Sequence, residues 1–261
     1  MATTQRDPRT AVAWEGVSKT YPNEFAAVRD VSLEAREGEV LALLGTSGSG
    51  KTTLLKMVNR LEPETSGRVV VDGKPTTDWR PIALRRSMGY VIQEGGLMPH
   101  MTILDNVALA ARIQGVDRAP ARDLALEKLA LVGLDPVRFG RHFPHGLSGG
   151  QRQRVGVARA LAASDKLILM DEPFGALDPI TRREVQDEFL RLQRELGTTV
   201  ILVTHDLREA CRLGDRLALL HEGRLLQTGH PTDFLNDPVD DHVARFFRDA
   251  GAVEIGREAP R

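Results

Sequence analysis

The chain has 261 residues, of which 41% are hydrophobic and 27% are charged, enough to build a sizeable core. Its 35 basic and 36 acidic side chains nearly cancel, which excludes a protein held on nucleic acid mainly by phosphate neutralisation. The apolar runs at 40–44 and 167–170 are about a quarter of the roughly 20 residues that a membrane helix needs. The N-terminus lacks the apolar segment of a signal peptide, and Cys211, the only cysteine, can form no intramolecular disulfide.

Strands are expected first along the chain. Apolar and β-branched residues favour strands at 11–17, 31–35, 40–44 and 68–71, and Asp72-Gly73 is typical of a hairpin turn. From about residue 102 the pattern becomes helical. Thr102 with Asp105 predicts a helix cap, and an apolar stripe over 121–132 predicts a second helix that ends at Gly133.

Alternating strands and helices return after this helical region. We expect a strand at 167–170, a helix from Asp178 to Gly197, a strand at 199–203 and a further helix. A mixed order of this kind predicts a single α/β domain. Its expected parts are a core at 11–92 and 160–230, a helical insert at 93–159, and a short C-terminal tail at 231–261.

A phosphate-binding loop is predicted after the strand at 40–44. Residues 45–52 match G-x-x-x-x-G-K-[ST] at every fixed position, and an amphipathic helix follows them. The backbone N–H groups of such a loop face phosphate oxygens, Lys51 would reach the β- and γ-phosphates, and Thr52 would ligate Mg²⁺. The alternative is a Gly/Ser-rich connecting loop, which the flanking strand and helix argue against. The predicted ATP-binding residues here are Gly45, Thr46, Ser47, Gly48, Ser49, Gly50, Lys51, Thr52 and Thr53.

Two acids follow the buried strand at 167–170. Asp171 and Glu172 would lie at the carboxyl edge of a sheet, where α/β folds bind ligands. Asp171 would hold Mg²⁺, directly or through water, and Glu172 would polarise a water for attack on the γ-phosphate. An acidic pair after a strand can also be a helix cap, so this prediction depends on the phosphate loop.

The segment at 147–154, Leu-Ser-Gly-Gly-Gln-Arg-Gln-Arg, resembles the signature sequence of the ABC (ATP-binding cassette) ATPases. Ser148 would cap a helix there, and a purely structural helix start is the alternative. The resemblance covers about residues 11–230. It implies a P-loop NTPase core with an antiparallel β subdomain and a helical insert, and it implies ATP and Mg²⁺ as ligands.

Further residues take roles from this resemblance. Tyr21 is similar to the aromatic residue that stacks on adenine, although packing is the alternative for a single Tyr after a strand. Gln93 resembles the glutamine that senses Mg²⁺ and the attacking water, and His205 resembles the histidine that contacts the γ-phosphate. Catalysis is thus expected from Glu172, His205, Gln93 and Lys51, and metal binding from Thr52, Gln93 and Asp171.

The resemblance also implies partners. In this family two subunits pair head to tail around ATP, so the partner's ATP would be bound in trans by Ser148, Gly149, Gly150, Gln151 and Asp178. A separate membrane permease would dock on the loop at 97–101 through Leu97, Met98 and Met101; the alternative is a loop folded onto its own insert. A solute-binding protein is a further expected partner. We therefore expect a peripheral subunit at the cytoplasmic face of the membrane.

The residues around these motifs resemble one branch of the family in particular. Residues 43–67 and 88–103 are similar to the quaternary-amine branch of bacterial importers, which take up glycine betaine, carnitine, choline or proline. About 38 residues follow Gly223, too few for the CBS modules that several members of that branch carry. The main alternative is an importer for a polar amino acid or other small solute; an exporter, a soluble ABC ATPase and a metabolic P-loop kinase fit less well.

Overall fold

The computed structural model describes residues 9–93 and 96–249. Within these ranges the strands form two sheets. The smaller sheet is antiparallel, in the order β2 (Ala26–Arg36), β1 (Thr10–Thr20), β4 (Ser66–Val71) and β5 (Lys74–Pro75). The larger sheet has the order β10 (Arg224–Gly229), β9 (Arg216–His221), β3 (Val40–Leu44), β8 (Thr199–Thr204), β7 (Leu167–Asp171) and β6 (Gly89–Val91).

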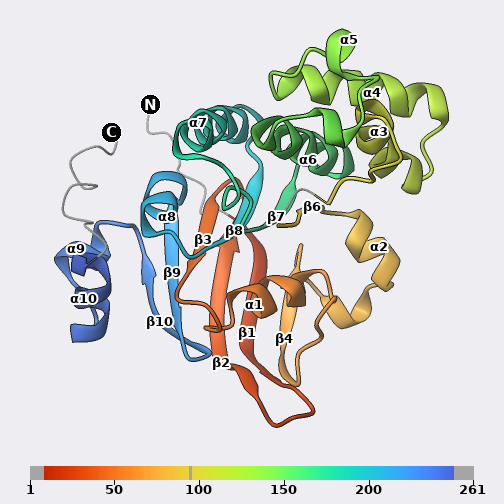
Figure 1. Cartoon of the computed structure of the whole chain (residues 1–261). Helices are drawn as coiled ribbons and strands as arrows, with labels where there is room; N and C mark the ends of the chain where they lie inside the picture. Colours follow the sequence, from red (N-terminus) through yellow and green to blue (C-terminus); the bar gives the residue numbers. More distant parts are fainter. Residues whose placement is uncertain (1–8, 94–95, 250–261) are drawn as a thin grey trace, which may run out of the picture.

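Helices cover the larger sheet and form a lobe beside it (Figure 1). The helices that pack on the sheets are α1 (Lys51–Val58), α2 (Pro81–Arg86), α7 (Pro179–Leu196), α8 (Leu207–Leu213), α9 (Asp233–Asn236) and α10 (Asp241–Asp249), with the short 3₁₀ turn η1 (Thr76–Asp78). The lobe lies between β6 and β7 in sequence and contains α3 (Ile103–Ile113), α4 (Arg118–Leu131), α5 (Pro136–Phe139), η2 (Pro144–Gly146) and α6 (Gly149–Ala163).

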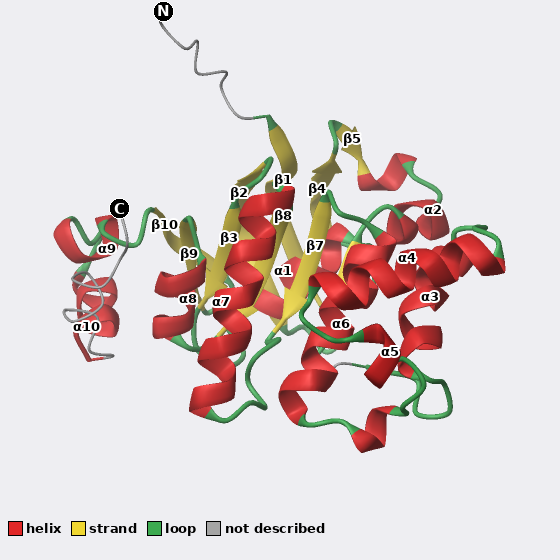
Figure 2. Ribbon diagram, turned by 90° about the horizontal axis from the view of Figure 1, so that it is seen from above, coloured by secondary structure: helices red, strands yellow, loops and turns green. Residues whose placement is uncertain are grey.

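The central strands are apolar on both faces because both faces are covered. β3 pairs in parallel with β8 and β9, and β7 pairs in parallel with β6 and β8. Alternate residues of β8 point to opposite faces: Ile201 and Val203 pack with α1 and the small sheet, whereas Val200 and Leu202 pack with α6 and α7. Figure 2 shows α7 and α8 side by side in front of the sheet.

Every strand and helix expected above is present. Thr102 caps α3 by accepting a hydrogen bond from the Asp105 amide at 3.1 Å, and Gly197 ends α7 at φ 63°. Asp72 and Gly73 form the expected tight turn, with φ 51° and 72°. The main difference is length: β2 begins at Ala26 and not near 31, because β-bulges in its pairing with β1 interrupt the alternation of apolar residues.

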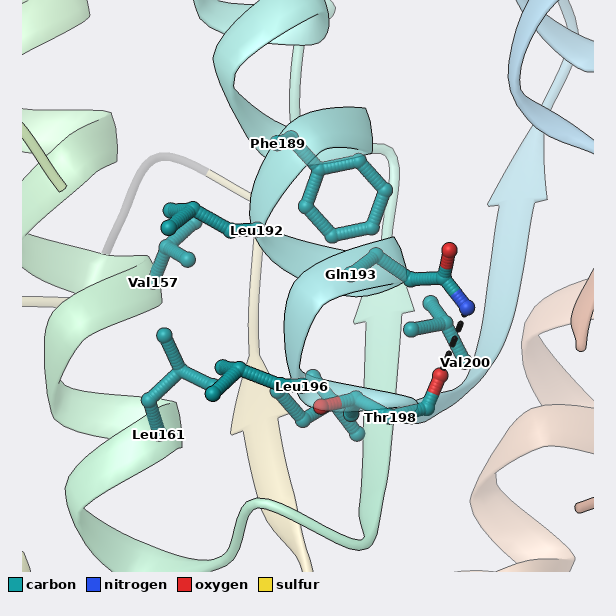
Figure 3. A pocket seen from close by; sticks show the side chains of 9 residues that line it. Val157, Leu161, Phe189, Leu192, Gln193, Leu196, Thr198 and Val200 are labelled. Atoms are coloured by element: carbon teal, nitrogen blue, oxygen red, sulfur yellow. Dashed lines mark hydrogen bonds between the residues drawn. The ribbon is translucent and has the colours of Figure 1, made fainter. Parts of the chain in front are cut away.

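A small apolar cavity lies between α6, α7 and the sheet (Figure 3). Two of the residues that line this cavity, Thr198 and Val200, lie at the amino end of β8, opposite to the carboxyl end of that strand. The volume, about 10 Å³, holds one water at most. This cavity is therefore a packing defect and has no room for a nucleotide.

Candidate functional site

The phosphate loop connects the carboxyl end of β3 to α1. Gly45 has φ 151° and Gly50 has φ 98°. A Cβ at Gly45 would lie 2.2 Å from the Leu220 carbonyl oxygen, and one at Gly50 would lie 2.3 Å from the Ala27 carbonyl oxygen. Only glycine therefore fits both positions, whereas a Cβ at Gly48 would meet no atom within 4 Å.

Lys51 lies inside this loop. Its Nζ donates hydrogen bonds of 2.8 Å to the Gly45 and Thr46 carbonyl oxygens. Burial lowers the pKa of the Lys51 ammonium, and the charges of Glu172 and Asp171 oppose that shift. The loop thus surrounds a cation at the start of a helix, which fits the recognition of a phosphate chain.

Oxygen donors suited to Mg²⁺ lie beside the loop. The Thr52 hydroxyl donates to Asp171 Oδ1 at 2.9 Å, bringing together residues from α1 and β7. Burial raises the pKa of the Asp171 carboxyl, and the hydrogen bond from Thr52 opposes that shift. The described residues contain no group of three His, Cys, Asp or Glu side chains that could hold a metal. A hydroxyl and one carboxylate fit an ion whose remaining ligands are phosphate oxygens and waters.

Three polar side chains meet at the carboxyl edge of the sheet. Glu172 Oε2 accepts a hydrogen bond of 3.4 Å from Gln93 Nε2 and lies 3.1 Å from His205 Nδ1. These residues follow β7, β6 and β8, which are neighbours in the sheet, so their loops emerge at one edge. The structure therefore brings together three of the four residues for which catalysis was predicted, next to the loop that holds the fourth.

Tyr21 lies at the start of the hairpin that joins β1 to β2. Its hydroxyl is 3.5 Å from Thr53 Oγ1, just beyond the phosphate loop, and Lys19 Nζ lies 5.2 Å from the centre of its ring. The ring is half-buried. This position beside the first turn of α1 is compatible with a base-stacking role.

The signature residues lie elsewhere. Ser148 and Gln151 form a capping box at the start of α6, in which each side chain bonds the other residue's backbone N–H. A Cβ at Gly150 would lie 2.4 Å from Thr181 Cγ2, so the signature helix packs closely on α7. Asp178 caps α7, and hydrogen bonds from Thr181 lower the pKa of its carboxyl. These residues therefore adjoin α7 and not the phosphate loop of the same chain.

The expected docking loop is held by one buried side chain that sequence analysis did not single out. Asn106 is fully buried; its Oδ1 accepts from the Met98 N–H at 2.7 Å, and its Nδ2 donates to the carbonyl oxygens of Met98 and Met101. Met98 is 40% exposed, whereas Leu97 packs against the helical lobe. The available signal was an amide within the apolar stripe of α3.

The fold and this site together define a P-loop nucleotide-binding protein with a helical lobe inserted before the strand that carries the acidic pair. The family model of the ABC transporter matches residues 28–175. The chain belongs to the ABC transporter family.

Three comparisons give the scale of the similarity. The chain is 48% identical to the choline transport ATP-binding protein OpuBA of Bacillus subtilis (strain 168), over 89% of this chain and 61% of that protein. It is 46% identical to the glycine betaine uptake system ATP-binding protein YehX of Escherichia coli (strain K12), over 94% and 78%. The dimeric ATP-binding cassette MJ0796, solved in a post-hydrolysis state with ADP and Pi, has a TM-score of 0.75 at 36% identity, covering 84% of this chain and 98% of that one.

The chain spans about three fifths of the length of OpuBA and of two related transport ATP-binding proteins. Among the described residues, no helix combines the length and the apolar character needed to cross a bilayer.

Proposed function

We propose that this chain binds and hydrolyses ATP as the energy-supplying subunit of a bacterial importer. The observation that carries this proposal is the meeting of Gln93, Glu172 and His205 beside the phosphate loop. A loop that only bound nucleotide would need no carboxylate held between an amide and an imidazole. The family supports the proposal, since relatives of similar sequence are named transport ATP-binding proteins.

The reaction follows from the roles of these side chains. Lys51 and the loop amides orient the β- and γ-phosphates, and Tyr21 stacks on the adenine. Mg²⁺, held by Thr52 and Asp171 with Gln93 nearby, would neutralise charge on the phosphate oxygens. Glu172 accepts a proton from water as the water oxygen bonds to the γ-phosphorus. The bond to the bridging oxygen breaks, and ADP leaves with the electron pair.

A second copy of the chain completes the site. Ser148, Gly149, Gly150, Gln151 and Asp178 lie away from the phosphate loop of their own chain and are available to ATP bound by a partner. The solved dimer of the MJ0796 cassette supports pairing of this kind. ATP then joins the two copies, and departure of the cleaved phosphate releases them.

Transport requires a permease. We infer that it docks on the loop at 97–101, where Met98 is exposed and Asn106 fixes the backbone. A peripheral position on the cytoplasmic face of the membrane, with a solute-binding protein on the other side, follows from that role. The solute class that we propose is a quaternary amine of the glycine betaine and choline type, because the relatives are named for such solutes.

Uptake of labelled glycine betaine after a salt upshift tests this proposal. The host lacks other betaine carriers and expresses either the wild-type chain or Glu172→Gln at equal abundance, each with the same permease. We expect Glu172→Gln to lower initial uptake at least about a hundredfold, because it removes the general base.

Hydrolysis of ATP by the purified proteins is measured in parallel. Hydrolysis that depends on Glu172, without betaine uptake, would reject the quaternary-amine solute and leave the ATPase; choline, carnitine and polar amino acids would be tested next. Equal hydrolysis by wild type and Glu172→Gln, together with no uptake, would reject the ATPase proposal itself.

A further inference from the structure

Helices α7 and α8 are joined along their length by polar side chains. The first contact is Arg182 Nη1 to Asp206 Oδ2, at 3.4 Å. One turn further along α7, the Gln186 Nε2 donates to Glu209 Oε1 at 2.9 Å, and both side chains are buried. The third contact is the ion pair between Asp187 and Arg212. Figure 2 shows the two helices adjacent to each other on the sheet.

Unlike the other two contacts, the first one also involves the loop that precedes α7. Arg182 Nη2 also donates to the Leu177 carbonyl oxygen at 3.0 Å and lies 3.5 Å from that of Gly175. Those carbonyls belong to the loop that ends at Asp178, the N-cap of α7. One guanidinium therefore holds a loop before α7 and a carboxylate before α8.

The carboxylate that Arg182 contacts belongs to Asp206, the residue immediately after His205 in the sequence. Asp206 Oδ1 caps α8 by accepting from the Arg208 and Glu209 amides, and the Asp206 N–H donates to Thr204 Oγ1. The two oxygens of Asp206 are thus divided between the helix cap and Arg182. Hydrogen bonds of Thr204 and Asp206, the two residues that flank His205 in the sequence, therefore hold the backbone of this turn.

We propose that Arg182 is a positioning residue, which fixes the loop of Asp178 relative to the turn of His205. This inference rests on the proposed function, in which Asp178 contacts the partner's nucleotide and His205 the chain's own γ-phosphate. A planar guanidinium with several donors can bind two carbonyls and a carboxylate at once. Closure of the dimer on Asp178 would therefore be transmitted to His205 without a change in the sheet.

The ion pair of Arg182 with Asp206 is about one-third exposed, so solvent screening limits its contribution to stability and its effect on the rate can be measured separately. The side chains of Arg182 and Asp206 are 30% and 36% exposed, and screened pairs of this kind contribute little to folding. Misplacing a group that touches the reacting phosphate is costly in rate. Arg182 should thus affect kcat for ATP hydrolysis more than the melting temperature or the KM.

The test compares Arg182→Met with a control in the same pair of helices. We expect Arg182→Met to lower kcat about ten- to a hundredfold, with the KM for ATP changed less than about twofold. Asp187→Ala breaks the third contact and touches neither loop, so its kcat should stay within about twofold of wild type. Equal loss of kcat in both variants would overturn the proposal, since Arg182 would then only join the helices.

Two further variants, Asp206→Asn and Arg182→Lys, test the same contact between Arg182 and Asp206. Asp206→Asn keeps an oxygen for the helix cap and should lower kcat, and its combination with Arg182→Met should be no worse than the stronger single variant. Arg182→Lys, which offers a charge without the planar fork, should restore part of kcat. If Arg182→Met does not fold, the kcat of Asp206→Asn compared with that of Asp187→Ala tests the proposal instead: equal values would overturn it.

Additive losses in the double variant, or a kcat unchanged by Arg182→Met in a wild type whose hydrolysis depends on Glu172, would refute the positioning role alone. A wild type that hydrolyses ATP no faster than Glu172→Gln would refute the proposed function, and the positioning role with it.

Discussion

Glu172 adopts a backbone conformation that residues other than glycine rarely adopt. Its φ is 45°, in the left-handed region, which costs a non-glycine residue about 1–3 kcal/mol. The conformation is held because the Glu172 N–H donates to the Val203 carbonyl oxygen at 3.0 Å, after β7 has ended. Strain therefore lies at the residue that we propose activates water, where the carboxylate meets Gln93 and His205.

Among single residues, Gly45 allows the most specific prediction about stability. Gly45→Ala should lower the free energy of unfolding by at least about 3 kcal/mol, because a Cβ 2.2 Å from a backbone oxygen forces the loop away from β9. Gly73→Ala is the matched control, with φ 72° and nothing within 4 Å of the new Cβ, and should cost about 1–2 kcal/mol. Denaturant unfolding without nucleotide measures both. Equal losses would show that only the backbone angle matters.

At the scale of elements, side-chain caps set where two helices of the lobe, α3 and α6, begin. Thr102 caps α3 and Ser148 caps α6, each through a hydrogen bond to the third residue of its helix. Asn106 extends the same principle beyond the helix, because it bonds the backbone of the preceding loop at several points. The start of α3 and the proposed docking loop are therefore one unit.

Asn106→Ala should disturb that unit. It removes the partners of the Met98 N–H and of the Met101 carbonyl oxygen, while the Met98 carbonyl keeps its bond from the Met101 N–H, and this should lower the free energy of unfolding by about 1–3 kcal/mol. Amide hydrogen exchange at Met98 should accelerate. Gln114→Ala, just after the same helix, is the control: it removes exposed hydrogen bonds to the Arg86 and Ala163 carbonyl oxygens but none to the loop at 97–101, so it should not accelerate exchange at Met98. Unchanged exchange at Met98 would contradict the role given to Asn106.

At the scale of the whole molecule, the signature residues and the phosphate loop of one chain lie in different parts of the fold. The signature residues and Asp178 adjoin α7, whereas the phosphate loop follows the carboxyl end of β3. Two copies arranged head to tail would place one chain's signature helix on the other chain's nucleotide. We propose that this arrangement is the reason why such widely separated motifs occur in one chain.

Glu172→Gln should therefore form a stable dimer when ATP and Mg²⁺ are added. The variant keeps the binding groups but cannot remove the γ-phosphate, so the state that joins the copies persists. Light scattering after gel filtration should show the mass doubling with ATP, and ADP should leave the protein monomeric. A Glu172→Gln chain that stays monomeric at saturating ATP would count against pairing through the signature residues.

The sequence by itself determined the local structure and the motifs. The glycines and lysine of the phosphate loop, the caps at Thr102, Ser148 and Asp178, and the buried strands were readable because each depends on residues close together in the chain. The short β6 and the largely polar β10 were not predicted: β6 has three residues, and β10 alternates too weakly to stand out from a loop. The bulges of β2 likewise hid its first residues.

Only the tertiary structure decided which of these residues meet. The contact of Gln93 and His205 with Glu172 depends on β6, β7 and β8 being neighbours in the sheet, although the helical lobe separates β6 from β7 along the chain and α7 separates β7 from β8. The contact of Arg182 with Asp206 likewise joins segments that reach each other only after the helices have packed. Local pattern specifies which face of an element is buried, but long-range packing chooses the neighbour against which it is buried, and that choice assembles the site.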